Sequence, residues 1–247
     1  MKKLLLGTAS LMIAVTAPMT AQAGDVSVST SIDYVSDYVF RGVSLAEQAV
    51  QPGVEVSVGD FTVGGWFSTG IGEASILAAD EFDLYASYGF ALSDKISASV
   101  GATYYHYPQG GDFFATDGGA AGTYEVSAGL EFDTMLAPSV TAYYDFTLEA
   151  FTVEGGVGHS VAINDVSSLD LGLTAGLVTA DEVSWEYGTA SASLGYAFTD
   201  DVSTYVGANY TLSSSDDEGL GLGFLDLLSG QGKSDLFWAG VGVAAGF

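Results

Sequence analysis

The 247-residue sequence predicts an all-β fold, namely a single up-and-down antiparallel transmembrane β-barrel of about 12 strands. Apolar and polar residues alternate in twelve segments, which is the period of a β-strand, and no segment shows a helical period. The apolar faces carry no Asp, Glu, Lys or Arg. An Arg or Lys at the middle of a lipid-facing strand costs about 2–4 kcal/mol. Lipid-facing strands therefore explain the pattern better than a secreted β-sandwich, which is the alternative.

The first 23 residues have the three parts of a secretory signal peptide. Two lysines precede an apolar run from Leu4 to Val15, and residues 21–23 read Ala-Gln-Ala, a typical cleavage site. The apolar run is shorter than the roughly 20 residues that a membrane-spanning helix needs. We therefore expect cleavage after Ala23 and a mature barrel domain of residues 24–247, exported to the bacterial outer membrane.

The composition is strongly acidic and lacks cysteine. The chain has 31 Asp and Glu against 5 Lys and Arg, which gives a formal net charge of -26. Such a charge argues against a nucleic-acid partner. The absence of Cys excludes a disulfide framework and a thiolate zinc site. No cofactor and no metal is expected.

The first half of the mature chain contains six alternating segments. A tight Gly59-Asp60 turn joins the second to the third, which is a hairpin signal. Residues 42–52, between the first two segments, are expected to form an outer loop. The six segments are Val26–Arg41, Val54–Val58, Phe61–Ile71, Phe82–Leu92, Ile96–His106 and Tyr124–Phe132.

The second half of the chain contains six more segments. The alternation changes phase near Gly188, which predicts a β-bulge there. The last segment ends on the aromatic Phe247, as in the closing strand of outer-membrane barrels, where this residue is part of the signal for the barrel-assembly machinery. The six segments are Val140–Leu148, Phe151–Ile163, Leu169–Leu177, Val183–Phe198, Val202–Leu212 and Phe237–Phe247.

Connection lengths orient the predicted barrel. With the amino end in the periplasm, the turns on that side are short, and most connections on the opposite side are longer. This asymmetry is typical of bacterial outer-membrane barrels, and an even strand number leaves both termini periplasmic. The short turns are 59–60, 93–95, 133–138, 164–165 and 199–201, and the longer loops are 42–52, 72–81, 108–123 and 213–234.

Aromatic residues concentrate near the ends of the segments, which predicts two girdles at the membrane interfaces. The expected partners on this surface are outer-membrane lipids and lipopolysaccharide. The outer girdle would hold Tyr38, Phe40, Phe67, Tyr104 and Phe237, and the inner girdle Phe90, Phe132, Phe198 and Phe247.

The longest loop carries two further signals. Residues 216–218 read Asp-Asp-Glu, which could bind Ca²⁺ or crosslink lipopolysaccharide through divalent ions, but the run lacks the ligand spacing of an EF-hand, so a solvated loop is favoured. Residues 220–228 are rich in Leu and Phe, which is uncommon for a loop in water. They could fold inward as a constriction, pack on the outer leaflet or contact a partner, and folding inward is slightly favoured.

Two motifs in the first half of the chain are distinctive together. Residues 36–42 read SDYVFRG, and residues 104–108 read YYHYP; between them lie Gly65-Trp66 and the run EFDLY at 81–85. This combination resembles the TorF family of bacterial porins over roughly residues 24–110. The resemblance implies a small outer-membrane barrel with a channel role, and it implies no catalytic residues.

The polar faces of the segments predict an aqueous lumen. Gly, Ser, Thr and Ala dominate them, and no internal helix is available as a plug. The function that these faces favour is passive diffusion of small hydrophilic solutes or ions, with a preference for cations because carboxylates concentrate counter-ions. The predicted pore-lining residues are Asp33, Asp37, Arg41, Glu55, Asp83, Glu125, Asp145, Glu154, Asp170 and Glu186.

The predicted selectivity depends mainly on the carboxylates in the middle of the segments and on Arg41. Asp145, Glu154 and Asp170 fall in the middle of their segments, where a pore is narrowest. Arg41 is the only basic residue on a predicted strand, and Glu55 is its nearest candidate partner if the first hairpin is regular. An ion pair that ties the wall together and a field across the constriction are the two roles open to Arg41.

Two other function classes stay open. One is a non-catalytic structural or adhesion barrel. The other is an outer-leaflet lipid-modifying enzyme, which would use a His activated by a neighbouring Ser, Asp or Glu. The chain has two His. Both His106 and His159 are expected on lipid-facing sides, which favours structural roles for them.

Overall fold

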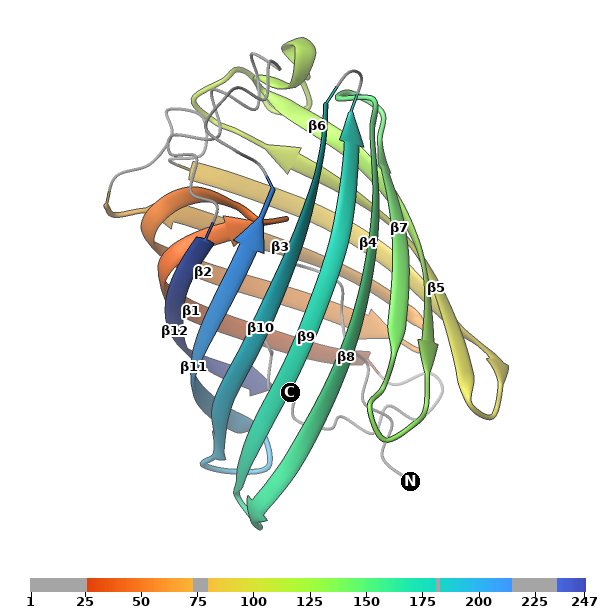
Figure 1. The fold of residues 1–247 in the computed structure, drawn as a ribbon, viewed down its shortest axis with the longest axis vertical. Coiled ribbons are helices and arrows are strands. Elements are labelled where there is room, and N and C mark those ends of the chain that lie inside the picture. Colours follow the sequence, from red (N-terminus) through yellow and green to blue (C-terminus); the bar gives the residue numbers. More distant parts are fainter. Residues whose placement is uncertain (1–25, 73–79, 181–182, 215–234) are drawn as a thin grey trace.

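The chain forms a closed antiparallel barrel of twelve strands in the computed structural model, as the sequence predicts (Figure 1). The structure describes residues 26–72, 80–180, 183–214 and 235–247. The predicted signal peptide and the acidic and apolar runs of the loop at 215–234 lie outside the described residues. The strands are β1 (Val26–Phe40), β2 (Val43–Val58), β3 (Phe61–Gly70), β4 (Asp80–Ser93), β5 (Ile96–His106), β6 (Gly122–Phe132), β7 (Ser139–Asp145), β8 (Ala150–Asn164), β9 (Ser167–Ala180), β10 (Val183–Ala197), β11 (Val202–Ser213) and β12 (Asp235–Gly246).

Each strand pairs with the next along the chain, and β12 pairs with β1 to close the barrel. At this seam the backbone of Val28 and that of Phe247 exchange two hydrogen bonds of 3.1 and 2.8 Å. Closure leaves no unpaired sheet edge, and this is the condition that a β-structure must meet in lipid.

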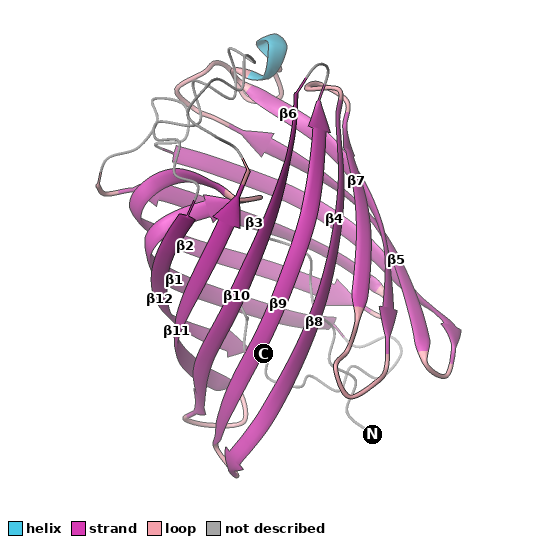
Figure 2. Cartoon of the chain, viewed as in Figure 1, coloured by secondary structure: helices cyan, strands magenta, loops and turns pink. Residues whose placement is uncertain are grey.

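The connections differ at the two ends of the barrel. Turns of at most six residues join β2 to β3, β4 to β5, β6 to β7, β8 to β9 and β10 to β11; we call this the short-turn end. The opposite end, the long-loop end, includes residues 107–121 between β5 and β6. That connection holds a 3₁₀ turn at Asp117–Gly119, the one helical element among the described residues (cyan in Figure 2). No described helix has the length and apolarity to cross a bilayer.

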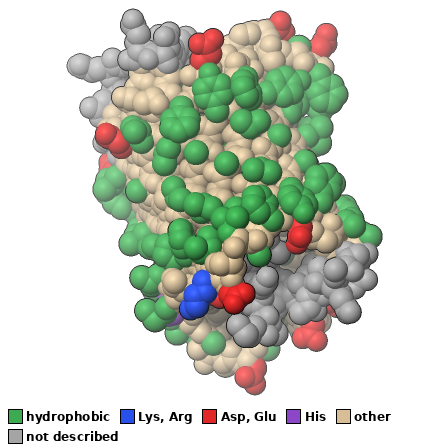
Figure 3. Space-filling view, turned by 90° about the vertical axis from the view of Figure 1, so that its right-hand side faces the viewer, with side chains coloured by type: hydrophobic (Ala, Val, Ile, Leu, Met, Phe, Trp, Pro, Cys, Tyr) green, Lys and Arg blue, Asp and Glu red, His purple; other side chains and the backbone are tan. Residues whose placement is uncertain are grey.

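The outward face of the barrel is apolar over its middle. Figure 3 shows green apolar side chains across this part of the surface, with red acidic side chains toward the two ends. This distribution matches the alternation of the sequence, because successive residues of a strand point to opposite faces. The exposed apolar residues include Val54, Val126, Leu130, Val157, Leu173, Leu194, Val206 and Val241.

The first hairpin departs from the prediction. Residues 42–52 were expected to form an outer loop, but β2 begins at Val43 and pairs with β1 through a two-residue turn at Arg41 and Gly42. Both turn residues have positive φ, 47° and 85°, as the most favoured hairpin turns require. The alternation in 43–52 is weak because this part of β2 is covered on both faces, so sequence periodicity could not mark it as a strand.

This hairpin does not continue the barrel wall but curves inward over the lumen (orange ribbons at the upper left of Figure 1). β1 stops pairing with β12 after Val35, whereas its pairing with β2 continues to Phe40 with a register shift between Tyr38 and Val39; the bend in β1 lies in this stretch. The tip contributes to a buried apolar cluster inside the barrel at the long-loop end, so the core of this protein lies within the lumen. The cluster consists of Val35, Tyr38, Val43, Leu45, Ala46, Ala49, Tyr107, Val178, Trp185, Tyr187, Leu236 and Trp238.

The predicted bulge near Gly188 is absent. β10 pairs with β9 and with β11 in one continuous register from Val183 to Ala197. The phase change in the sequence arises because Trp185 and Tyr187, which are apolar and aromatic, point into the lumen and pack on the inward hairpin. The residue between them, Glu186, is therefore exposed on the outward side, and its prediction as a pore-lining residue is wrong.

Candidate functional site

The candidate site is the lumen, and its constriction is the tip of the β1–β2 hairpin. Arg41 at the tip reaches across the barrel to Glu125 on β6, 84 positions along the chain. The two terminal nitrogens of the guanidinium group, Nη1 and Nη2, donate to the carboxylate of Glu125 at 2.7 and 2.9 Å. Such a bidentate pair is the strongest form of a charged hydrogen bond in proteins. The ion pair is almost buried, with side-chain exposures of 13% for Arg41 and 4% for Glu125.

The expected pairing of Arg41 with Glu55 is therefore wrong. Because the tip bends inward, Arg41 leaves the wall on which Glu55 lies. Glu55 instead accepts a hydrogen bond of 3.1 Å from the hydroxyl of Tyr85. The partner of Arg41 could not be found from sequence spacing, since nothing local in the chain relates it to Glu125.

Aromatic rings complete the surroundings of Arg41. Its guanidinium carbon lies 4.5 Å from the ring centre of Tyr143 and 4.7 Å from that of Phe40. The hydroxyl of Tyr105 donates to Glu125 at 3.0 Å. The carbonyl oxygen of Arg41 accepts a hydrogen bond of 2.9 Å from the indole nitrogen of Trp185 on β10. The tip is thus fixed to three strands of the barrel wall, namely β6, β7 and β10.

The hairpin also removes two residues from the predicted outer girdle. Tyr38 is only 3% exposed, packs on Trp66 with ring centres 5.5 Å apart, and hydrogen-bonds Glu81. Phe40 is partly buried and lies against Tyr105. Both were placed on the lipid side because the alternation of β1 was extended past the bend.

Beneath the tip, the wall carries a repeated arrangement of a carboxylate, a glycine and a tyrosine on three adjacent strands. In the first triplet, Glu55 on β2 pairs in register with Gly64 on β3, which pairs with Tyr85 on β4. A Cβ on Gly64 would overlap the tyrosine ring, so the ring lies flat over the glycine. Its hydroxyl thereby reaches the carboxylate two strands away.

Two further triplets have the same register. Glu154, Gly176 and Tyr187 lie on β8, β9 and β10, and the tyrosine hydroxyl donates to the carboxylate at 2.5 Å. In the third, Asp33 on β1, Gly242 on β12 and Tyr205 on β11 are paired across the seam, and Tyr205 hydrogen-bonds Asp33. A Cβ on either glycine would overlap the tyrosine, as at Gly64. Aromatic residues that cover glycines in this way stabilise sheets and pin their register.

These triplets could not be predicted from the sequence, although all three carboxylates are among the predicted pore-lining residues. The parity of the sequence places Tyr85 and Tyr205 on polar faces, but it does not relate them to a carboxylate two strands away. Register between distant strands such as β1 and β11 is also not visible in a sequence. A tyrosine at the polar parity of a barrel segment, as at Tyr85 and Tyr205, is the signal that could have indicated them.

The other predicted carboxylates have several different surroundings. Asp83 is buried under the tip, beside Glu81 on the same strand, and one oxygen of each has no hydrogen-bond partner in the described part of the chain. Asp170 is partly exposed and accepts from Ser168 at 2.8 Å. Asp37 lies in the hairpin opposite Glu47 and is partly buried.

Asp145 has a structural position. It was expected mid-strand, but it is the last residue of β7 and accepts hydrogen bonds of 2.8 Å from the backbone nitrogens of Thr147 and Leu148. A carboxylate in this position orders the turn to β8, as Asp side chains commonly do. It belongs to the rim of the lumen at the long-loop end.

The two histidines have other neighbours than the Ser, Asp or Glu that a catalytic pair would need; the hydroxyl near His106 is that of Tyr104, 3.4 Å from Nδ1. His106 lies on the outward side under Phe113, with ring centres 4.6 Å apart, and its Nδ1 is 2.9 Å from the carbonyl oxygen of Ala121. His159 is exposed, with Nδ1 3.0 Å from the carbonyl oxygen of Met135.

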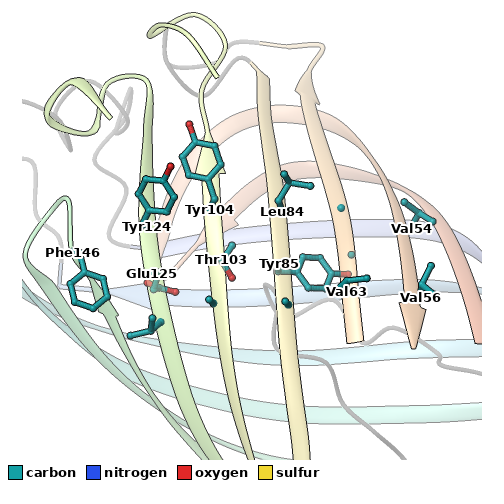
Figure 4. Close-up of a pocket in the computed structure, with 15 residues that line it drawn as sticks. Val54, Val56, Val63, Leu84, Tyr85, Thr103, Tyr104, Tyr124, Glu125 and Phe146 are labelled. Atoms are coloured by element: carbon teal, nitrogen blue, oxygen red, sulfur yellow. The ribbon is translucent and has the colours of Figure 1, made fainter. Parts of the chain in front are cut away.

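A shallow hollow of about 630 Å³ lies on the wall formed by β2 to β7. Figure 4 shows its side chains, including the Tyr85 ring extending along the wall. Most of its lining residues, such as Val63, Leu84 and Tyr124, lie on the outward face. This hollow is therefore a feature of the apolar surface and not of the lumen.

Solved structures with a similar fold include outer-membrane channels. The structure titled "KdgM porin" has a TM-score of 0.54 at 11% identity and covers 90% of this chain and 99% of its own. The structure titled "NanC porin" has a TM-score of 0.53 at 15% identity, with 88% and 98% covered. The COG4313 outer membrane channel from Pseudomonas putida F1 has a TM-score of 0.50 at 11% identity, with 92% and 97% covered.

At these identities the likeness establishes the barrel fold. No curated protein matches the chain. The resemblance to the TorF family is not confirmed by the comparisons, whereas the porin-like barrel that it implied is present. The family model that does match is described as "Bacterial protein of unknown function (Gcw_chp)" and covers residues 19–219, including the inward hairpin. The chain is thus a member of the Gcw_chp family.

Proposed function

We propose that this protein is an outer-membrane channel for passive diffusion of small hydrophilic solutes or ions, with a preference for cations. The observation that carries the proposal is the contrast between the two faces of one closed sheet. The outward face is apolar over its middle, whereas the inward face carries hydroxyls, glycines and carboxylates. A barrel with this polarity fits lipid outside and water inside.

Outside the buried cluster at the long-loop end, the inner wall supports movement of solutes because the tyrosine rings of the triplets are held aside. In each triplet the tyrosine lies flat over a glycine, so the ring does not extend across the lumen. The small side chains elsewhere on the inward faces leave further space; they include Ser127, Gly129, Gly156, Gly172, Thr174, Ser191, Ser193 and Gly207.

The preference for cations follows from the charge on this wall. Asp33, Glu55 and Glu154 lie on it, with no Lys or Arg near them in the described strands other than Arg41, which Glu125 already neutralises. Carboxylates in a narrow, low-dielectric passage concentrate cations and exclude anions.

Planar-bilayer recording of the purified, folded protein tests the proposal. We expect discrete conductance steps with the mature chain, and no steps with the same preparation after heat unfolding. A folded barrel that never conducts, even when Arg41 has been replaced to release the tip, would contradict a channel role and favour a structural or adhesion barrel.

A further inference from the structure

We propose that the clamp around Glu125 is a binding site for solutes that bear a guanidinium group, and that Arg41 is its internal occupant, which such a solute displaces. This inference rests on the proposed channel function, because the solute must enter the lumen to reach the clamp. It identifies a class of ligand and, with it, the condition under which the tip leaves the lumen.

The clamp has the chemistry that recognises a guanidinium group and not merely a positive charge. Glu125 holds the group through two parallel hydrogen bonds of 2.7 and 2.9 Å. The ring of Tyr143 lies 4.5 Å from the guanidinium carbon. A planar cation with a fork of donors matches both features, whereas an ammonium ion can use the charge but not the fork.

The clamp is built into the barrel wall and not into the hairpin that fills it. Glu125 is on β6, Tyr143 on β7, and Tyr105, which orients Glu125 through a bond of 3.0 Å, is on β5. The three strands are consecutive neighbours in the sheet. Withdrawal of the tip would therefore remove Arg41 and Phe40 but leave the rest of the clamp in place.

Arg41, which occupies the clamp, lies in a turn whose backbone is strained. Arg41 adopts a φ of 47°, a region in which a residue other than Gly or Asn costs of order 1–3 kcal/mol. The turn type favours Asn or Asp at this position, and neither of these could reach Glu125 as a cation. Arginine at the tip is thus explained by the contact that its side chain makes, not by the turn.

The surroundings favour entry of an organic cation. Asp83 and Glu81 are buried close to the clamp on β4, and one carboxylate oxygen of each lacks a hydrogen-bond partner in the described part of the chain. The other described basic residue, Lys95, lies in a turn at the short-turn end. A cationic solute near the clamp therefore meets oxygen acceptors that have no partner in the described part of the chain, and Arg41 is the only Lys or Arg near it there.

Chemical rescue of Arg41→Ala tests the site without relying on conductance. The folded variant in detergent is heated with methylguanidinium chloride or methylammonium chloride at equal millimolar concentration, and the midpoint of the heat-induced mobility shift is measured. The midpoint of the variant is expected to lie below that of the wild type. We expect methylguanidinium to restore at least half of this decrease in midpoint, and methylammonium to restore much less. Equal effects of the two salts would overturn the proposal.

Two controls locate the effect. In Arg41→Ala combined with Glu125→Gln, methylguanidinium should have no specific effect, and a specific effect that persists there would overturn the assignment to Glu125. Lys95→Ala, which removes a distant exposed cation, should respond to each salt as the wild type does. If Arg41→Ala does not fold, Arg41→Lys keeps the charge but loses the fork, and the same selective gain in midpoint is expected.

The experiments distinguish failure of the proposed channel function from failure of the proposed clamp. Selective rescue in a barrel that never conducts would support the clamp and contradict the channel. In a conducting barrel, methylguanidinium added to wild type should raise the open fraction, because it competes with Arg41 for Glu125. Conduction that responds to methylguanidinium no more than to methylammonium would support the channel and contradict the clamp.

Discussion

Glu55 and Tyr85 are joined by a 3.1 Å hydrogen bond that passes over Gly64, the residue that lies between them in register on the intervening strand. The bond depends on the absence of a side chain at position 64, because a Cβ there would occupy the space of the ring. Charge, ring position and free width of the lumen are therefore coupled at one point of the wall. The same coupling recurs at the other two triplets.

Replacing Gly64 by Ala should destabilise the barrel and narrow the lumen. The methyl group forces the Tyr85 ring off the wall, which breaks its bond to Glu55; overpacking of this kind costs about 1–3 kcal/mol. The midpoint of heat unfolding and the single-channel conductance should both fall. Gly89→Ala on β4 is the matched control, since a Cβ at Gly89 meets nothing within 4 Å.

A double replacement checks the cause of that effect. When Tyr85 is also replaced by Ala, the added methyl at position 64 has no ring to displace. Its cost should then be much smaller than in the wild-type background, because the two positions are in contact. Strict additivity of the two changes would contradict the interpretation.

Replacing Arg41 by Ala should lower stability and raise conductance. Removing one partner of a buried ion pair costs about 3–5 kcal/mol, since the other charge stays buried and unpaired. Glu125 is 96% buried by its 4% exposure, so the upper part of this range applies. The checks are heat resistance of the folded form and conductance, with Lys95→Ala as control. If both properties stayed at wild-type values, Arg41 would have neither a structural nor a constricting role.

Cation preference should appear as a reversal potential of cation-selective sign across a tenfold KCl gradient near neutral pH. Replacing Asp33 by Asn, and Glu55 and Glu154 by Gln, removes three charges from the wall but keeps oxygen acceptors for the tyrosines. The potential should then move toward zero. Glu186→Gln is the control, because this acid is exposed on the outward side and should not affect selectivity. A value near zero or of anion-selective sign in the wild type would contradict the preference.

Deletion of Phe247 should reduce the yield of assembled barrel more than Phe247→Ala does. The reason is that the backbone hydrogen bonds at the β1–β12 seam contribute to assembly in addition to the aromatic ring. Deletion removes both backbone hydrogen bonds to Val28, whereas the alanine variant keeps them and loses only the ring, which is 75% exposed. Yield of heat-modifiable protein in the outer membrane measures both. Equal losses would assign the whole effect to the ring as an assembly signal.

The barrel could be predicted from the sequence because each strand has one largely apolar face on the outside of the barrel. The alternation of strands such as β8 and β11 is therefore clear, and the strand number and the short turns followed from it. The prediction failed where the inward face of a strand also packs against protein. Residues 43–52 of β2 and the start of β10 pack against protein on the inward side, and there the alternation no longer indicates which face is which.

The site was only partly accessible to the same reasoning. Parity alone placed Asp33, Glu55 and Glu154 on polar faces, which is where the structure has them. The partners of these residues depend on register across two strands, and the partner of Arg41 depends on the bend in β1 between Val35 and Phe40. Such long-range relations have no local trace in a single sequence.

The apolar cluster inside the barrel also sets an order of events during folding. Its members come from the first two strands, from Tyr107, and from residues of β9, β10 and β12 near the other end of the chain. The hairpin tip thus lacks part of the surface on which it packs until β10 and β12 have arrived, and β12 is also the strand that closes the ring. Completion of the ring and docking of the tip should therefore form one cooperative step, so that an open, partly inserted intermediate carries its arginine outside the lumen.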